Sequence, residues 1–190
     1  MSRFSNLDEI RRLDPEKDHQ RIAYLDSVFE FPWDTTRSLE FALFRTYGVP
    51  KSSRLLQHTE ELEYRTQKRY DDTVLILSEI LEHGYDSERG LTALRRMNQQ
   101  HGTYPISNEE FLYVLTTFVF EPIRWMERFA WRPMIREEKL ANYYYCANSV
   151  SVWALKISRT PTKHSNNTTW NTKQNIFDLT RRTGALVRQR

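Results

Sequence analysis

Apolar residues recur at intervals of three and four along most of the first 150 residues, which is the spacing of one face of an α-helix. Pro32 and Gly48 each follow such a segment and are typical of helix ends. No stretch of useful length in this part alternates with period two. The sequence therefore predicts an all-α bundle of about six or seven helices, over residues 18–31, 36–47, 52–60, 61–83, 88–101, 108–130 and 136–147.

Two of these segments carry informative detail. In residues 18–31, Ile22, Leu25, Val28 and Phe29 share one face and are expected to be buried. The segment 108–130 begins after a serine that is followed three residues later by a glutamate, Ser107 and Glu110. That spacing predicts a capping box at the start of the helix.

The longest periodic segment, 61–83, has two contrasting faces when it is placed on a helix. One face is expected to point to the core and holds Leu62, Thr66, Arg69, Thr73, Ile76 or Leu77, and Ile80. The opposite face is largely charged and holds Tyr64, Lys68, Asp71, Leu75, Glu79 and Glu82. Arg69 and Thr73 thus lie one helical turn apart on the inner face.

Composition narrows the protein class. A chain of 190 residues with 39% hydrophobic and 28% charged residues is typical of one soluble globular domain, and its single cysteine, Cys146, excludes an internal disulfide. The charged N-terminus has no signal-peptide pattern, and the longest nearly uncharged run, 111–120, is too short to span a bilayer. We therefore expect a reducing location, in the cytoplasm or on a cytosolic membrane face.

Charge divides the chain into two predicted parts. Residues 151–190 hold eight Lys or Arg and one acid, which gives +7, whereas residues 1–150 carry −4. We predict a helical domain over 1–150 and a basic, polar, disordered or aberrant tail over 151–190. The basic residues of the tail are scattered, so we do not expect nucleic-acid binding. We do expect weak contact between the tail and acidic membranes.

An arginine on a buried face needs an anionic partner. For Arg69, the carboxylates of a haem would serve, because guanidinium pairs well with carboxylates. A protein acid such as Asp72 or Glu121 would serve equally well. The pattern leaves both interpretations open.

Histidines are the other candidates for chemistry, since a neutral imidazole is a common iron ligand. His101 and His83 both end a predicted helix and are equal candidates by spacing. His19, His58 and His164 lie in polar contexts, where we expect them to be exposed. A histidine in a last helical turn also interacts favourably with the helix dipole without binding a metal.

Other chemistries have little support in this sequence. It contains no G-x-S-x-G, no P-loop and no H-E-x-x-H motif. Adjacent acids such as Glu109 with Glu110 and Glu137 with Glu138 fall on helix starts or polar faces, so they are expected to be solvated.

A family resemblance adds to this pattern. Residues from about 64 to 145 resemble the MpaB-type (endoplasmic-reticulum-bound) oxygenase and rubber oxygenase (latex clearing protein) family, in its fungal MpaB-like branch. Four segments in family order carry the resemblance: YRTQKRYDDT (64–73), MNQQHGTYPI (97–106), NEEFLYVLTTF (108–118) and EPIRWMERF (121–129). Together they are fairly specific, whereas any one alone would be weak.

The resemblance implies a globin-like fold with a non-covalent b-type haem. It implies His101 as the axial ligand of the haem iron, and Arg69 and Thr73 as catalytic residues of the haem pocket, since rubber oxygenases have an arginine and a threonine at this spacing. The implied reaction is O2-dependent cleavage of a carbon–carbon double bond in an apolar, isoprenoid-like substrate.

The chain also departs from the family. Family members are longer, and the sequence after Tyr145 turns abruptly from a family-like pattern to an unrelated polar one. We therefore expect a truncated gene product, intron read-through or a shifted frame near residue 146. The alternative function is that of a non-catalytic helical protein or degenerate fragment without haem, which acts by binding a partner.

Overall fold

The computed structural model describes residues 3–152, and within that range the chain forms helices joined by short turns, with no β-strand. This confirms the all-α class. The helices are α1 (Ser5–Ile10), α2 (His19–Leu25), the π-helical turn η1 (Asp26–Glu30), α3 (Pro32–Thr46), α4 (Pro50–His58), α5 (Glu61–Tyr64), α6 (Thr66–His83), α7 (Glu88–Gly102), α8 (Asn108–Phe129) and α9 (Arg136–Val152). They outnumber the predicted six or seven because α1 was not foreseen and two predicted helices are each divided.

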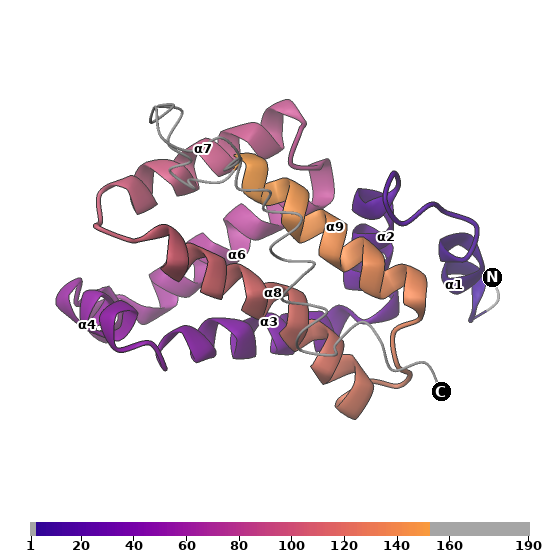
Figure 1. Cartoon of the computed structure of the whole chain (residues 1–190), viewed down its shortest axis with the longest axis horizontal. Helices are drawn as coiled ribbons and strands as arrows, with labels where there is room; N and C mark the ends of the chain where they lie inside the picture. The colour runs from indigo at the N-terminus through magenta and orange to yellow at the C-terminus, as the bar shows by residue number, and fades with distance from the viewer. Residues whose placement is uncertain (1–2, 153–190) are drawn as a thin grey trace, which may run out of the picture.

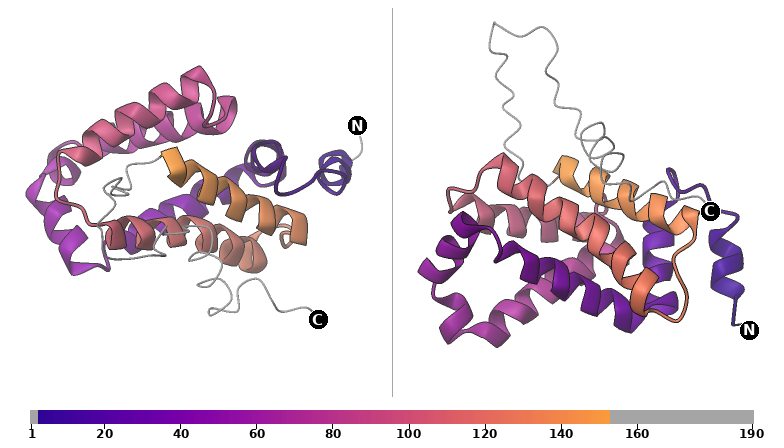
Figure 2. Two further views of the ribbon diagram at one scale, coloured as in Figure 1. Left: turned by 45° about the horizontal axis from the view of Figure 1, so that its top comes forward. Right: turned by 60° about the horizontal axis from the view of Figure 1, so that its bottom comes forward.

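Three pairs of helices build the molecule: α3 packs along α8, α6 along α7, and α2 along α9. Figure 2 shows the α6–α7 pair on one side and the α3–α8 pair on another. The α6–α7 pair has its own apolar contacts, centred on Ile80, Ala93 and Leu94. Residues 61–102 thus form one wall of the molecule, and the predicted site residues all lie on it.

A close backbone approach explains the glycine near the start of α7. A Cβ atom built on Gly90 would lie 1.9 Å from the carbonyl oxygen of Gly84, the residue that directly follows α6. Only glycine permits the turn between the two helices to pass so near to α7. Ser87 caps α7, because its hydroxyl oxygen accepts a hydrogen bond from the Gly90 N–H at 3.0 Å.

The predicted helix 18–31 changes its hydrogen-bond register halfway. The Phe31 N–H donates to the Asp26 carbonyl oxygen five residues earlier, at 2.7 Å, which makes residues 26–30 a π-helical turn. The register shift turns Val28 and Phe29 outward, to 40% and 54% exposure. The expectation that these two residues are buried was therefore wrong, while Ile22 and Leu25 are buried as predicted.

The predicted helix 61–83 is divided as well. Arg65 leaves the helical conformation, so the single turn of α5 ends at Tyr64 and α6 begins at Thr66. From Arg69 onward the two-faced pattern holds along α6: Ile80 is buried and Arg69 and Thr73 are half-buried, whereas Asp71 is exposed. Thr66, which was predicted on the inner face, is exposed because it lies at the first residue of the helix.

The capping box at the start of α8 is confirmed in both directions. The Glu110 N–H donates to the Ser107 hydroxyl oxygen at 3.3 Å, and the Ser107 N–H donates to the Glu110 carboxylate at 2.9 Å. Such a cap typically contributes about 1 kcal/mol to helix stability. It sets where α8 begins relative to the end of α7, and so places Phe111 beside His101.

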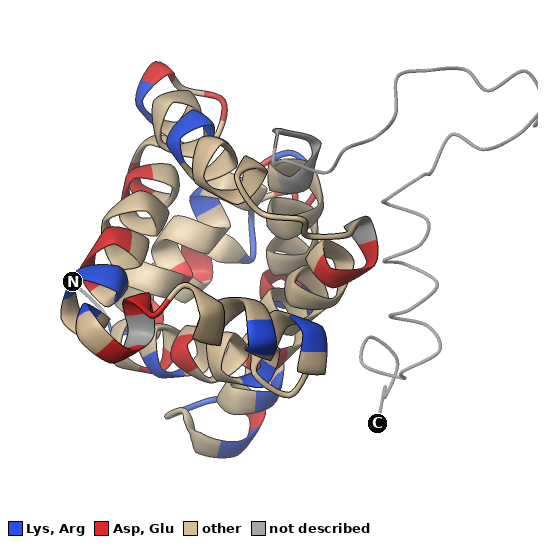
Figure 3. Cartoon of the chain, turned by 90° about the vertical axis from the view of Figure 1, so that its left-hand side faces the viewer, with Lys and Arg blue, Asp and Glu red and all other residues tan. Residues whose placement is uncertain are grey.

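Charges of both signs are interspersed on the helices of the described part (Figure 3). Within residues 3–152, no helix is both long and apolar enough to cross a membrane. The predicted tail, 151–190, lies outside the described residues apart from the end of α9, so the division at residue 150 stays a prediction.

Candidate functional site

A cavity of about 850 Å³ lies between the α6–α7 wall and the rest of the molecule. Its size is within the range of pockets that hold cofactors and small molecules. Most of its lining surface is apolar, and its walls come from η1 and from every helix between α3 and α9. Its apolar side chains include Phe31, Leu39, Leu43, Leu55, Leu77, Phe111, Val114, Phe118, Met126 and Met134.

All three predicted site residues line this one cavity: Arg69 and Thr73 from α6, and His101 from α7. The Thr73 hydroxyl donates to the carbonyl oxygen of Arg69 at 2.9 Å, so its free lone pairs remain available as acceptors. The structure therefore brings together residues that are 32 positions apart in the sequence.

Arg69 has neither of the protein partners that the sequence offered. Within residues 3–152, no acidic side chain lies within 4 Å of its guanidinium group. Asp72 pairs with Lys68 at 2.5 Å instead. The other candidate, Glu121, pairs with Arg45 at 2.7 Å and Arg124 at 2.5 Å. An internal ion pair for Arg69 with either acid is thus excluded.

The charge of Arg69 acts on the pKa values of two neighbouring side chains, Tyr47 and His101. Burial raises the pKa of Tyr47, at the end of α3, and the nearby Arg69 charge opposes that rise. Burial also lowers the pKa of His101, and here the Arg69 charge lowers it further. A half-buried cation therefore lies between a tyrosine and a histidine in a mostly apolar space.

His101 lies in the last turn of α7 and is partly buried. The centroid of its ring is 5.5 Å from that of Phe111, with the rings edge to face. Because burial and Arg69 both lower its pKa, the imidazole is neutral near pH 7. Neutral imidazole is the form that binds a metal through a ring nitrogen.

The other described histidines do not share this setting. His83 is not among the cavity-lining residues, and its Nε2 lies 3.8 Å from Glu79 and 3.9 Å from Glu82. His58 is exposed. His164 lies outside the described residues. Of the two candidates that spacing made equal, only His101 lines the cavity.

His19 corrects an expectation. It is buried, not exposed, with ring nitrogens 2.6 Å from the Glu16 carbonyl oxygen and 2.7 Å from the Tyr85 hydroxyl. Both nitrogens have partners within the protein, so His19 joins α2 to the α6–α7 turn as a structural residue.

Glu110 is a further acid on the cavity wall, and it too was expected to be solvated. Burial by itself would raise its pKa, but hydrogen bonds from Lys51, at 2.8 Å, and from Ser107 outweigh this and lower the pKa to about 2. This carboxylate is ionised and already paired, and its role is to cap the N-terminus of α8.

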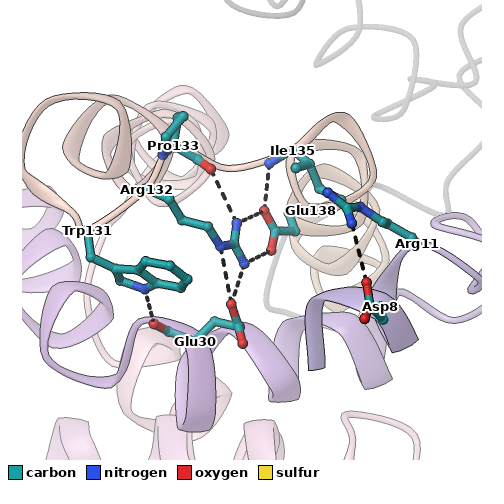
Figure 4. Close-up of polar contacts among 8 residues, drawn as sticks. All are labelled: Asp8, Arg11, Glu30, Trp131, Arg132, Pro133, Ile135 and Glu138. Atoms are coloured by element: carbon teal, nitrogen blue, oxygen red, sulfur yellow. Dashed lines mark hydrogen bonds and ion pairs between the residues drawn. The ribbon is translucent and has the colours of Figure 1, made fainter. Parts of the chain in front are cut away.

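A buried ionic cluster beside the cavity was missed entirely by sequence reasoning (Figure 4). Arg132, in the α8–α9 turn, donates to Glu30 at 2.5 Å and to both oxygens of Glu138 at 2.6 and 2.8 Å. The Ile135 N–H also donates to Glu138, at 2.6 Å. Asp26 lies next to this cluster and lines the cavity.

Only one sequence signal could have drawn attention to this cluster. Asp26 comes four residues after Ile22 and directly after Leu25, so a carboxylate interrupts an otherwise apolar helix face. Glu138 was expected to be solvated and is instead fully buried. The sequence around Arg132 did not indicate a buried ion pair, because a single arginine in a turn is usually exposed to solvent.

The cavity residues fit the haem that the resemblance implies, judged by donor chemistry. A haem needs an apolar slot, a neutral nitrogen ligand and cations for its carboxylates. The lining offers an apolar wall, His101 and the unpaired guanidinium of Arg69. Elsewhere in residues 3–152, no three His, Cys, Asp or Glu side chains gather closely enough to hold a metal ion by themselves.

Three known proteins are similar to this chain over part of its length. It is 36% identical over 111 residues to "ER-bound oxygenase mpaB" of Penicillium brevicompactum, which covers 55% of this chain and 28% of that protein. It is also 36% identical over 111 residues to "ER-bound oxygenase mpaB'" of the same species, with 55% and 26% covered. The protein named mpaB in Penicillium roqueforti (strain FM164) is 34% identical over 118 residues, with 59% and 40% covered.

The chain thus spans between about a quarter and two fifths of the length of these relatives. No family model matches it. No solved structure matches it either. Over somewhat more than half of its own length, the chain is similar to proteins named ER-bound oxygenase mpaB.

Proposed function

We propose that this chain carries the haem-binding half of an oxygenase site, with His101 as the iron ligand and Arg69 and Thr73 as pocket residues. The observation that carries the proposal is the guanidinium of Arg69. It lies half-buried in a largely apolar cavity beside a neutral His101, with no carboxylate within 4 Å among the described residues. A buried charge without a partner is costly, which favours an anionic ligand at this position.

Each residue has a role in this proposal. His101 offers a neutral ring nitrogen to iron, and Phe111 packs edge-on against its ring. Arg69 pairs with a propionate carboxylate of the haem. The Thr73 hydroxyl, whose proton is donated to the Arg69 carbonyl, faces the cavity as an acceptor. The apolar walls exclude water and hold an apolar chain.

The reaction class is supported by the relatives, which are named oxygenases. A haem in such a site supplies the means to bind and activate O2. We propose that O2 is used to cleave a carbon–carbon double bond of an isoprenoid-like substrate, as the family resemblance implies. The names of the relatives, which describe them as ER-bound, support placing this activity at the endoplasmic reticulum. We propose the cytosolic face of that membrane.

Absorption spectroscopy with reconstituted haem tests the proposal. The parent protein, His101→Ala and the matched control His83→Ala are each mixed with hemin, then reduced with dithionite and exposed to CO. His83 lies in the last turn of α6, as His101 lies in the last turn of α7, but it does not line the cavity.

A sharp Soret band that shifts on reduction and with CO is expected in the parent and in His83→Ala, and is expected to be lost in His101→Ala. The same spectrum in all three proteins would contradict ligation by His101. A parent protein that binds no haem would favour the alternative function, a helical protein that acts by binding a partner.

A further inference from the structure

We propose that the outer face of α3 is a membrane-docking surface, by which the protein lies on a phospholipid bilayer with its cavity open toward the lipid. We call this surface the α3 face and define it by Trp33, Phe41 and Phe44 on α3 and by Tyr47, which directly follows that helix. The proposal rests on the proposed function, which places the protein at a membrane and gives it an apolar substrate. It goes further in naming the surface that contacts the lipid.

The first observation is that α3 buries small side chains and exposes large ones. Its buried residues recur at intervals of four and are Ser38, Ala42 and Thr46. On the outward side, Trp33 is 64% exposed and Phe44 is 67% exposed. A surface helix of a globular protein normally does the reverse, since its large apolar residues face the core. The outer face of α3 therefore has the composition of a surface that is covered by something apolar.

The exposed aromatic side chains of α3 lie together. The ring centroids of Phe41 and Phe44 are 6.4 Å apart, and those of Phe44 and Tyr47 are 6.2 Å apart. Trp33 lies about two helical turns before Phe41, on the same side of α3. Single exposed apolar residues are ordinary on a protein surface, whereas a contiguous group of them indicates an interaction site.

The cavity opens within this face. Phe44 and Tyr47 both line the cavity and are exposed to solvent, and the same is true of Tyr70 and Val74 on α6. A side chain that lines a cavity and also reaches solvent marks the opening between the two. The opening thus lies between α3 and α6, with apolar side chains on both sides. An apolar molecule that enters from a bilayer at this place reaches the cavity without crossing water.

The acids of α3 are already engaged by neighbouring groups. Arg37 donates to the Glu40 carboxylate at 2.7 Å, and the Tyr70 hydroxyl donates to the same carboxylate at 2.8 Å. Asp34 accepts a hydrogen bond from the indole N–H of Trp125 at 2.9 Å. A charge that is paired and hydrogen-bonded costs less to bring near lipid than one without partners. These acids are therefore compatible with contact between the α3 face and a bilayer.

An unpaired arginine at the edge of the α3 face favours contact with anionic headgroups. The ring of Trp125 on α8 lies 6.2 Å from that of Trp33 and 4.7 Å from that of Phe129, which is exposed. The guanidinium carbon of Arg128 is 5.3 Å from the centroid of the Phe129 ring. Within residues 3–152, Arg128 forms no ion pair. Exposed aromatic rings and arginines are the residues that anchor proteins at the headgroup level of a bilayer.

A bilayer fits this surface better than a protein partner does. A protein bound on the α3 face would close the opening of the cavity, whereas lipid leaves it accessible to an apolar substrate. The helix α3 has 15 residues, which is too short to span the bilayer, so it would lie in the plane of the interface. Such contact requires exposed apolar area and cations at its edge, and the α3 face has both.

Vesicle flotation tests the proposal, with phosphatidylcholine vesicles that either contain or lack phosphatidylserine. The first variant carries Trp33→Ser and Phe41→Ser together. Neither residue lines the cavity, so haem binding should be unaffected. The matched control carries Tyr64→Ser and Leu75→Ser, which replace two exposed apolar residues outside the α3 face and outside the cavity lining.

The parent and the control are expected to bind vesicles equally well. The protein with Trp33→Ser and Phe41→Ser should bind about tenfold more weakly, which is the effect of losing two partly inserted aromatic side chains. Circular dichroism checks that the helices of each protein are intact. If the double variant does not fold, Phe41→Ser alone replaces it, with an expected loss of about threefold.

The contribution of charge is tested separately with Arg128→Gln. This variant should bind vesicles that contain phosphatidylserine about fivefold more weakly, and should bind phosphatidylcholine vesicles as the parent does. The control is Arg95→Gln, which removes an exposed arginine from α7, on the opposite side of the molecule from α3 (Figure 1). Equal binding by the two variants would overturn the role of Arg128.

Three outcomes of the flotation assay would overturn the docking surface: no vesicle binding by the parent, equal binding by the parent and the double variant, or an equal loss in the control. A dimer of the parent in size-exclusion chromatography that the double variant loses would also overturn it, because the α3 face would then bind a second copy of the chain. These assays use neither haem nor O2. The haem proposal can therefore fail while the loss of vesicle binding persists, and a protein that binds haem but no vesicles would refute only the docking surface.

Discussion

Arg69 and Arg132 are both shielded from solvent, yet their surroundings differ. Arg132 lies between two carboxylates of the same chain, with contacts of 2.5 and 2.6 Å, and its guanidinium carbon is 4.6 Å from the centroid of the Phe31 ring. Arg69 faces a cavity, and no acid within 4 Å compensates its charge among the described residues. The charge of Arg132 is compensated within the fold, whereas Arg69 has room for an external anion. Partners, more than burial, distinguish a structural arginine from a candidate binding residue.

The strongest test of this contrast removes Arg132. Arg132→Ala leaves three buried carboxyl groups without a cation, and we expect the free energy of unfolding to fall by about 3–5 kcal/mol. Urea unfolding followed by circular dichroism measures the change. Arg11→Ala is the control, because Arg11 pairs with Asp8 at 3.3 Å on the surface, where such pairs contribute about 1 kcal/mol or less. Equal losses in the two variants would mean that the buried cluster is not structural.

Removing Arg69 should change stability little and weaken haem binding. In Arg69→Ala we expect stability to change by no more than about 0.5 kcal/mol, because no ion pair is lost. Haem affinity should fall about ten- to hundredfold, the effect of a lost charge-assisted hydrogen bond.

Hemin titration of the parent, Arg69→Ala and the control Arg65→Ala measures this difference. Arg65 is exposed one turn before Arg69 and pairs with Glu61 at 3.5 Å. Equal haem affinity in all three proteins would remove the assignment of Arg69 to a propionate. A large loss of stability in Arg69→Ala would instead restore a structural role.

The smallest expected effect is a pH dependence that arises from His101. Its folded pKa lies below the ordinary value of 6.5, so the unfolded chain binds more protons just below pH 6.5. The contribution of His101 to stability is thus fully present above about pH 6.5 and is lost as pH falls toward the lowered pKa.

Urea midpoints of the parent and His101→Ala, measured between about pH 7.5 and about pH 5, test this sign. The parent should lose more stability than the variant over that range. Parallel profiles would show that the surroundings of His101 do not disfavour its charged form, and would weaken its assignment as a neutral ligand.

The sequence predicted the local features of this fold well. The two faces of α6, the capping box of Ser107 and Glu110, and the end of α7 near Gly102 all follow from neighbours within four residues. The inward position of Arg69 and Thr73 follows from the same spacing. Such features need only helical periodicity and capping chemistry, which short segments express by themselves.

Features that depend on distant partners were not predicted. The π-helical turn reverses which residues of 26–30 are buried, and nothing in the local pattern shows that register shift. His19 is buried because Tyr85, 66 positions away, bonds its ring. Glu30 is buried because Arg132 reaches it from 102 positions away.

By itself, the sequence determined that this chain is helical, which face of α6 points inward, and that it resembles a family of oxygenases. Tertiary structure alone decided that His101, and not His83, shares a cavity with Arg69, and that Arg69 lacks the acids that spacing had offered it. It also decided that a buried Asp26 lines that cavity. The physical reason is that helical periodicity is a property of neighbours, whereas partners, protonation states and cavities arise only when distant helices pack.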